Sequence, residues 1–194
     1  MQKHPSSRRR DAAGTRQAIL ESAKQSFARC GYEGVGVREI AAGAGVTAML
    51  VNRYFGSKEK LFAEAVGASL KRPTILSQEN LSSPTMARLM AAVLVKITDI
   101  ESDPLEGFQI LLRSVSSKSA ARIGRKAIED GHQKAMVAAL RGNLVPQRAA
   151  ILLSVIAGFQ MMRQMLGLSS LAKADPKDLT ALLSGVFDRL IEGR

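Results

Sequence analysis

The 194-residue sequence has few of the residues that support disulfide, metal and cofactor chemistry. It contains one cysteine, Cys30, so an intrachain disulfide and a cysteine-rich zinc site are excluded. Because Cys30 follows the apolar positions of a predicted helix, we expect a buried structural thiol in a reducing cytoplasm.

The two histidines offer little support for catalysis. His132 and Glu129 form one Glu-x-x-His step, whereas a di-iron bundle needs two such steps and two further carboxylates. The chain also has no phosphate-binding or dinucleotide-binding glycine motif, and no supported His-dependent triad. The sequence therefore predicts neither an enzyme nor a bound metal or cofactor.

Aromatic residues make up only 4% of the chain, and tryptophan is absent. Methionine and alanine supply much of the 46% hydrophobic content, and no long stretch alternates with a period of two, so we expect an all-α fold. The most apolar run, residues 149–162, is too short to cross a bilayer and indicates a buried helix. With no secretory signal visible, we expect a cytoplasmic protein without a membrane partner.

Acidic residues are scarce in the first third of the chain, and the net charge of +11 is correspondingly uneven. Residues 1–72 contain 13 Lys and Arg against 6 Asp and Glu, whereas residues 73–194 contain 15 against 11. A basic region of this kind attracts polyanions, with DNA first and an anionic membrane second. Charge alone does not choose between them.

Composition divides the chain into three parts. Residues 1–14 indicate a disordered basic arm, either a solvated tail or an arm that contacts phosphates. Residues 15–70 predict a compact helical domain that begins with a helix capped by Thr15. Serines and prolines then mark a connector, and residues 71–194 predict a second helical domain with helices near 84–101, 104–116, 118–140, 146–167 and 176–192.

The segment from Arg38 to Phe55 has the spacing of a helix-turn-helix. Ala41 is small where the two helices would nearly touch, and Gly45 suits a left-handed turn residue. The positions that must lock the pair are all apolar: Ile40, Ala44, Val46 and Val51. The pattern predicts helices from Val37 to Ala44 and from Thr47 to Tyr54.

On the second of these helices, a period of 3.6 residues that places Val51 in the core points Met49 and Arg53 outward. Leu50 and Asn52 flank them. This face could enter a major groove, where thymine methyls accept apolar contacts and Arg or Asn bonds base edges. The alternative is that Met49 and Leu50 pack on a neighbouring helix. Tyr54 and the helix start at Ser57-Lys58 could bind phosphates.

The stretch TRQAILESAKQSFARCGYEGVGVREIAAGAGVTAMLVNRYFGSKEKLF, residues 15–62, resembles the DNA-binding domain of TetR-family transcriptional regulators. The resemblance implies an all-helical homodimer that binds a double-stranded operator and releases it when a small molecule enters the C-terminal domain. It places the DNA-binding residues at Arg38, Thr47, Ala48, Met49, Leu50, Asn52, Arg53, Tyr54 and Lys58. Gly36, Met49 and Asn52 depart from the family's common residues, which leaves the phosphate contacts and the operator sequence open.

Candidate ligand-pocket residues follow from core-like spacings in the C-terminal half. They are Met86, Met90, Phe108, Leu112, Met136, Phe159 and Met162, with Arg113 or Gln160 as a polar anchor. Each apolar residue could equally be ordinary core. The long helices near 146–167 and 176–192 carry small residues that permit close approach, and we expect them to form a dimeric four-helix interface.

These observations predict an all-α protein with an N-terminal three-helix, helix-turn-helix domain and a C-terminal ligand-binding and dimerisation domain. The predicted function is a ligand-released transcriptional repressor that binds a palindromic operator. Activation in place of repression stays open. The alternative is a helical small-molecule carrier or enzyme with a nonspecific basic surface.

Overall fold

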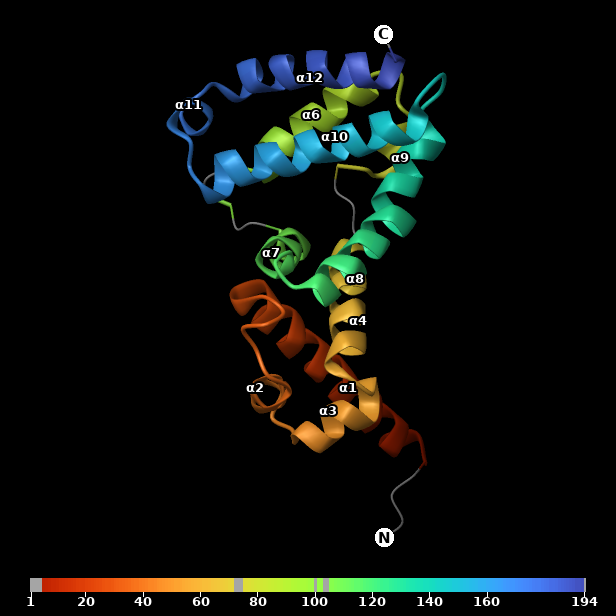
Figure 1. The fold of residues 1–194 in the computed structure, drawn as a ribbon, viewed down its shortest axis with the longest axis vertical. Coiled ribbons are helices and arrows are strands. Elements are labelled where there is room, and N and C mark those ends of the chain that lie inside the picture. Colours follow the sequence, from red (N-terminus) through yellow and green to blue (C-terminus); the bar gives the residue numbers. More distant parts are fainter. Residues whose placement is uncertain (1–4, 72–74, 100, 103–104, 194) are drawn as a thin grey trace. The chain divides into compact units, whose positions relative to one another are not determined.

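The computed structural model describes residues 5–71, 75–99, 101–102 and 105–193, with side chains from Ala12 onward. Every regular element in these ranges is a helix, which confirms the all-α fold class (Figure 1). The chain forms two compact units: unit 1 lies within residues 1–71 and 106–127, and unit 2 within residues 72–105 and 128–194.

Unit 1 is built from six helices, the last of which ends at the border with unit 2. They are α1 (Pro5–Cys30), α2 (Val37–Gly43), α3 (Ala48–Phe55), α4 (Lys58–Leu70), α7 (Glu106–Ser114) and α8 (Lys118–Ile128). The domains predicted from the sequence place α7 and α8 after the boundary at residue 71, whereas the compact units place them with the N-terminal helices.

The predicted start of the first helix at Thr15 is wrong, because α1 begins at Pro5. Arginine and alanine, which favour helix, fill most of residues 8–13, and proline is tolerated in a first turn. Residues 1–4 of the predicted basic arm lie outside the described residues.

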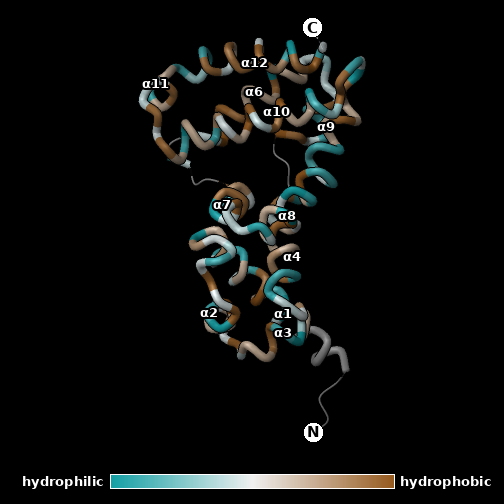
Figure 2. Tube along the Cα trace, viewed as in Figure 1, coloured by the Kyte–Doolittle hydropathy of each residue, from teal (hydrophilic) through white to brown (hydrophobic). Residues whose placement is uncertain are grey.

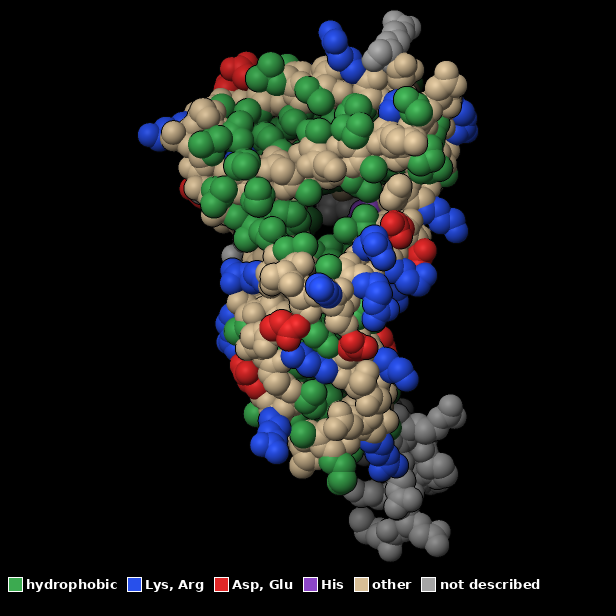
Figure 3. Space-filling model, viewed as in Figure 1, with side chains coloured by type: hydrophobic (Ala, Val, Ile, Leu, Met, Phe, Trp, Pro, Cys, Tyr) green, Lys and Arg blue, Asp and Glu red, His purple; other side chains and the backbone are tan. Residues whose placement is uncertain are grey.

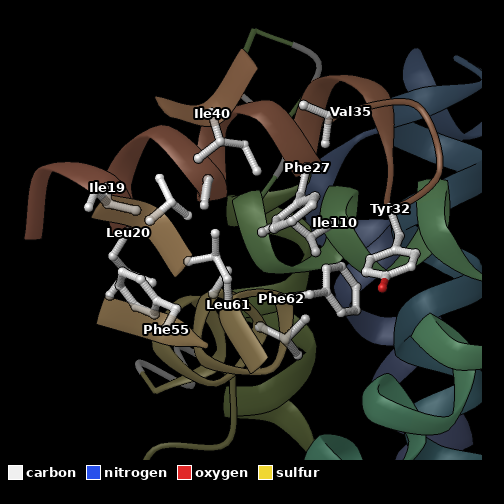
Figure 4. Packing of buried hydrophobic residues seen from close by; sticks show 14 of the residues in the cluster. Ile19, Leu20, Phe27, Tyr32, Val35, Ile40, Phe55, Leu61, Phe62 and Ile110 are labelled. Carbon is white, nitrogen blue, oxygen red and sulfur yellow. The ribbon is translucent and has the colours of Figure 1, made fainter. Parts of the chain in front are cut away.

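An aromatic cluster forms the centre of unit 1 (Figure 4). Phe27 meets Phe62 edge to face at a centroid distance of 5.0 Å, and Tyr32 meets Phe62 at 5.0 Å. Ile110 of α7 is fully buried in the same cluster. Aromatic pairs of this geometry contribute about 0.5–1.5 kcal/mol each beyond their area burial. The core thus joins α1, α4 and α7.

Close contacts hold α7 against α1 and α4. Gly31, at φ +70°, ends α1 so near α7 that an added Cβ would lie 2.2 Å from the carbonyl oxygen of Arg113. Glu106, in the first turn of α7, pairs with Lys24 of α1 at 3.1 Å and accepts a hydrogen bond from Ser69 of α4 at 3.0 Å. Sequence periodicity reports faces of single helices and contains no signal for this long-range packing.

Unit 2 surrounds a second core. Its helical elements are α5 (Gln78–Ser82), α6 (Met86–Ile97), η1 (Glu129–Gln133), α9 (Lys134–Ala139), α10 (Val145–Gln160), η2 (Met161–Met165), α11 (Ser169–Ala172) and α12 (Pro176–Glu192). In Figure 1, α6, α10 and α12 run side by side, and their inner faces bury Met90, Leu94, Leu152 and Phe187.

Hydrogen bonds from Arg148 join the end of α12 to the turn before α10. Its Nη1 donates to the carbonyl oxygens of Leu190 and Ile191 at 2.9 Å, and its Nε donates to Asn143 at 2.8 Å. The guanidinium therefore satisfies carbonyl groups that a helix end leaves without intrahelical partners.

Two of the C-terminal helix predictions, and the predicted connector, need refinement. The predicted helices 118–140 and 146–167 are interrupted by the π-helical segments η1 and η2, and the connector after residue 71 contains the unpredicted short helix α5. The predicted start at Pro104 lies outside the described residues. The helix 176–192 is confirmed, with Asp175 accepting a hydrogen bond from the backbone N–H of Lys177.

The exposure of Cys30 differs from the prediction. Cys30 is exposed, so the predicted buried thiol is wrong: Phe27 is the last α1 side chain on the fully buried stripe, and Cys30 ends the helix.

By length and composition alone, the stretch Val145–Met165 could cross a membrane, a test that core helices of soluble proteins also pass. Its inward side contains Arg148, Gln160 and Arg163, all at least nine-tenths buried.

Candidate nucleic-acid interface

The pair α2 and α3 has the turn geometry that the sequence predicts. Gly45 adopts φ +67°, and the N–H of Val46 donates to the carbonyl oxygen of Ala41 at 2.9 Å. Thr47 caps α3 by accepting from the N–H of Leu50 at 3.4 Å, which is a long hydrogen bond. Gly36 stands at the N-cap of α2 and supplies no side-chain hydrogen bond.

Buried side chains lock α3 onto the rest of unit 1. Val51 and Phe55 are 1% and 4% exposed, as the predicted core position of Val51 requires. The guanidinium of Arg16 lies over the Phe55 ring at 4.6 Å and pairs with Glu64 of α4. These contacts hold α3 at a fixed orientation relative to α1 and α4.

A buried hydrogen bond and a close packing contact join α1 to α2. Ser22 donates a buried hydrogen bond to the carbonyl oxygen of Ile40 at 2.8 Å. An added Cβ on Gly43 would lie 2.5 Å from the Ser22 hydroxyl, so this close approach needs glycine at residue 43. Ala41, predicted as the small residue between the helices, is buried in the same core.

The predicted base-contacting face of α3 is open to solvent. Met49 is 77% exposed, which excludes the alternative in which it packs against a neighbouring helix of the described structure. Asn52 and Arg53 are also exposed, while Ala48 and Leu50 are half-buried. Arg53 forms no ion pair with any described residue, so its guanidinium is available to a ligand.

The predicted phosphate-contacting residues differ in their surroundings. Arg38 is exposed in the first turn of α2, and Tyr54 is half-buried at the end of α3. Lys58 is half-buried, with its ammonium 4.4 Å from the centroid of the Tyr32 ring. That cation–π contact would have to be given up, at least in part, for Lys58 to bind a phosphate.

Lys60 is a further basic residue at this junction and is not among the predicted DNA-binding residues. It is exposed, and its ammonium lies 3.7 Å from the position that a Cβ of Gly56 would take. Gly56 separates α3 from α4 with φ +80°. Lys60 lies two residues after Lys58 at the same helix start, and this position is the sequence signal that could have identified it as a phosphate-contacting residue.

Unit 1 carries almost all of the net charge. Its residue ranges contain 17 Lys and Arg against 7 Asp and Glu, a net charge of +10, whereas those of unit 2 contain 11 against 10. Basic side chains also gather over α8 in Figure 3, and the hydrophilic stretch from α8 into α9 appears teal in Figure 2. The structural grouping thus concentrates the charge more strongly than the sequence division suggested.

The pKa values of two groups in unit 1 are raised above their ordinary values. Burial, followed by the charges of Glu59 and Glu33, raises the pKa of Tyr32. Burial alone would lower the pKa of Lys24, but hydrogen bonds with Glu21 and Glu106 raise it. Both groups therefore keep their protons at neutral pH, and Lys24 supports the α1–α7 contact as a cation.

The predicted ligand-pocket residues do not lie in a single unit. Phe108, Leu112 and Arg113 belong to α7 in unit 1, where Arg113 is exposed and donates to the carbonyl oxygen of Arg29 at 2.8 Å. The remaining candidates belong to unit 2. Met86, Met90 and Met136 are buried in its core, Phe159 packs against that core, Gln160 is buried and Met162 is 39% exposed.

A shallow groove of about 470 Å³ lies between α6 and α12 and is lined by Arg88, Ala92, Pro176, Lys177, Thr180, Ala181 and Ser184. No group of three or more potential metal-ligating side chains occurs among the described residues. Burial lowers the pKa of His132, which lies in η1.

Two family descriptions match the sequence. The one for bacterial regulatory proteins of the tetR family covers residues 19–65, and the one for the tetracyclin repressor-like C-terminal domain covers residues 85–191, more than half of the chain. The HTH-type transcriptional repressor AcnR of Corynebacterium efficiens is 46% identical over 48 residues, 25% of this chain and 26% of that protein. The alignment therefore spans about a quarter of this curated relative.

Solved structures match over nearly the whole chain. A transcriptional regulator from Rhodococcus sp. is similar with a TM-score of 0.64 and 24% identity, covering 92% of this chain and 96% of the other. The multidrug binding protein EbrR, complexed with ethidium, is similar with a TM-score of 0.62 and 18% identity, covering 91% and 98%. At these identities the likeness concerns the fold.

Proposed function

This chain belongs to the tetR family of bacterial regulatory proteins, and we propose that it binds a palindromic DNA operator as a homodimer in the cytoplasm and releases it when a small molecule binds unit 2. The observation that carries the proposal is the exposed face of α3. Met49, Asn52 and Arg53 face solvent on a helix whose opposite side is fixed by Val51 and Phe55. Such a face fits a major groove.

The charge of unit 1 supports binding to the DNA backbone. A net charge of +10 attracts phosphates regardless of sequence, and the exposed cations Arg38 and Lys60 lie near the two ends of the α2–α3 segment. Phosphate contacts would set the register of α3, while Arg53, Asn52 and Met49 would read base edges and a thymine methyl.

An apolar face on unit 2 supports the homodimer. Ile151 of α10 and Leu182 and Val186 of α12 are 50%, 71% and 44% exposed. Hydrophobic side chains gather over α10 and α12 in Figure 3. Gly158 and Gly185 have no atoms within 4 Å of an added Cβ, so a second helix could approach there closely. We propose that α10 and α12 pair with their copies in a four-helix arrangement.

The relatives support repression and ligand control as the mode of action. AcnR is a transcriptional repressor, and EbrR is a multidrug binding protein complexed with ethidium. In this chain, Met90 and Met136 are buried in the core of unit 2, and methionine cores can re-pack around a ligand. Bound ligand would release DNA only if it favours a conformation with lower operator affinity.

Selection of binding sites from random duplex DNA tests the proposal. The full chain should enrich inverted half-sites one or more helical turns apart, each turn being ~34–36 Å. The rival function is a helical carrier with a nonspecific basic surface, and it predicts no enrichment and one salt-dependent affinity for all duplexes. Transcription in vitro from a promoter that overlaps the enriched site should fall when the protein is added; a rise would indicate activation.

A further inference from the structure

The buried stripe of α10 ends in polar residues. Ala149, Leu152 and Ile156 face the core of unit 2 at helical spacing, and Gln160 and Arg163 continue the same stripe. Gln160 is 3% exposed and Arg163 is 2% exposed. Two polar side chains therefore occupy positions where a helix of this kind normally places apolar ones.

Three polar atoms of this group have no hydrogen-bond partner among the described residues. The Nε2 of Gln160, the Nε of Arg163 and the Oε1 of the neighbouring Gln164 are all buried without a hydrogen bond. A buried donor that lacks an acceptor lowers the stability of the fold, so native proteins rarely retain one without a reason. Here two such donors come from consecutive positions of a single stripe.

Arg163 is also a buried charge that has no counter-charge among the described residues. Its Nη1 donates to the carbonyl oxygen of Val95 at 2.5 Å and to the hydroxyl of Thr98 at 3.2 Å. Both acceptors are neutral groups at the end of α6. No carboxylate of the described chain lies within ion-pairing distance of Arg163. A buried cation without an anion is unfavourable until a negative group binds beside it.

Arg163 lies in an unusual backbone segment and beside an aromatic ring. Arg163 lies in the π-helical segment η2, a geometry that occurs frequently at functional sites. The ring of Phe159 lies 5.9 Å from the guanidinium carbon.

We propose that the effector of this regulator is an anionic small molecule whose carboxylate binds Arg163 and Gln160. The proposal rests on the proposed function, because it names the ligand class of the site in unit 2. The carboxylate accepts from the Nε of Arg163 and the Nε2 of Gln160 and neutralises the buried charge. The apolar body of the effector contacts Phe159.

The competing account gives Arg163 only a structural role, in which Nη1 caps the end of α6. That account predicts that Gln160, which does not take part in the cap, is dispensable for ligand binding. The variant Gln160→Leu separates the two, because it replaces an unsatisfied donor with a branched apolar side chain that is one atom shorter. We expect its melting temperature without ligand to equal or exceed that of the wild type. A fall of several degrees would overturn the inference.

Ligand binding is measured on the full-length protein by thermal shift and by release of the selected operator. The probes are straight-chain carboxylates from butyrate to decanoate, benzoate and phenylacetate, each paired with its primary amide. At least one carboxylate should raise the melting temperature and release the operator, while its amide should do neither at the same concentration. Failure of every carboxylate, or equal effects of acid and amide, would overturn the inference.

Variants assign the effect to the cluster. Gln160→Leu and Arg163→Met should each weaken the active carboxylate about 10- to 100-fold, the range expected for losing a hydrogen bond to a charged group. Arg88→Met, which removes an exposed arginine of α6, should leave this affinity unchanged. An unchanged affinity in Gln160→Leu contradicts the proposal even if Arg163→Met fails to fold.

Operator binding without any probe keeps the two proposals apart. If wild type and variants bind the selected operator alike and only neutral molecules release it, the ligand class is wrong and the proposed function stands. If the wild type selects no operator at all, the proposed function is wrong, and the thermal shift with carboxylates still reports on Arg163 and Gln160 independently.

Discussion

Arg53 and Lys60 are both exposed cations close to the end of α3, yet they should contribute to binding in different ways. Arg53 projects from the middle of an exposed helical face beside Asn52, whereas Lys60 lies next to the backbone of Gly56 at the start of α4. A guanidinium on the groove-facing side can form two hydrogen bonds with one guanine, while an ammonium beside a helix start meets phosphates. Substitutions of the two residues should separate recognition of bases by Arg53 from binding of phosphates by Lys60.

Arg53→Ala should cost about 1–3 kcal/mol of binding free energy at the selected operator and relax specificity at one base pair of each half-site. Because the side chain is exposed and forms no ion pair with another described residue, the fold should keep its melting temperature. Fluorescence anisotropy with operator variants at each base pair measures the effect. A uniform loss of affinity across all sequences would contradict base reading by Arg53.

Lys60→Ala and Lys58→Ala test which lysine contacts phosphate. Lys60→Ala should weaken specific and nonspecific duplexes equally and reduce the salt slope by about 1 per half-site. Lys58→Ala should also lower thermal stability, by the ~0.5–1 kcal/mol typical of a cation–π contact, because its ammonium lies over Tyr32. Anisotropy titrations at several salt concentrations, with thermal melts, compare the two. A normal salt slope in Lys60→Ala would remove that residue from the interface.

At the scale of elements, the sequence was most informative where structure is local. Gly45 occupies the predicted turn position, and Thr47 and Ser57 cap α3 and α4 at the predicted helix starts, because turn and cap chemistry depends on near neighbours. The placement of α7 against α1 and α4 could not be predicted, because it depends on Gly31 and Glu106 meeting partners far along the chain. The same limit applies to Lys58, whose contact with Tyr32 is tertiary.

Gly31→Ala tests whether the end of α1 fixes α7. Alanine at φ +70° costs roughly 1–2 kcal/mol, and its Cβ would also collide with the carbonyl oxygen of Arg113. We expect a loss of at least ~1–2 kcal/mol in the free energy of unfolding, measured by urea denaturation. Gly67→Ala is the matched control: Gly67 lies within α4 with open space around it, so the change should be neutral or slightly stabilising. Equal stability of both variants would show that the α1–α7 contact is loose.

At the scale of the whole molecule, charge and apolar surface are divided between the units. Unit 1 has the net charge of +10, and unit 2 has the exposed apolar face of α10 and α12. This division fits a protein that binds DNA through one unit and a second copy of itself through the other. The exposed apolar side chains on α10 and α12 could be located only in the structure, because core and interface positions share the same helical period.

Leu182→Glu tests the homodimer. Leu182 is 71% exposed on α12, so a carboxylate there should leave the fold intact and oppose pairing of the apolar faces. Analytical ultracentrifugation at micromolar concentration should give a dimer for the 20.8-kDa wild-type chain and a monomer for the variant. Val115→Glu, at an exposed apolar residue of unit 1, should remain dimeric. A monomeric wild type would contradict the proposed interface.

The central claim is that two copies of α3 read a symmetric DNA sequence. The most direct test is the affinity of the full-length protein for the selected palindrome, compared at 150 mM salt with two duplexes of equal composition. One half-site is scrambled in the first of these duplexes, and both half-sites are scrambled in the second. A dimeric reader should prefer the intact palindrome by at least ~10³-fold over fully scrambled DNA, with the half-scrambled duplex in between. Equal affinity for all three duplexes would show that the exposed face of α3 does not read sequence.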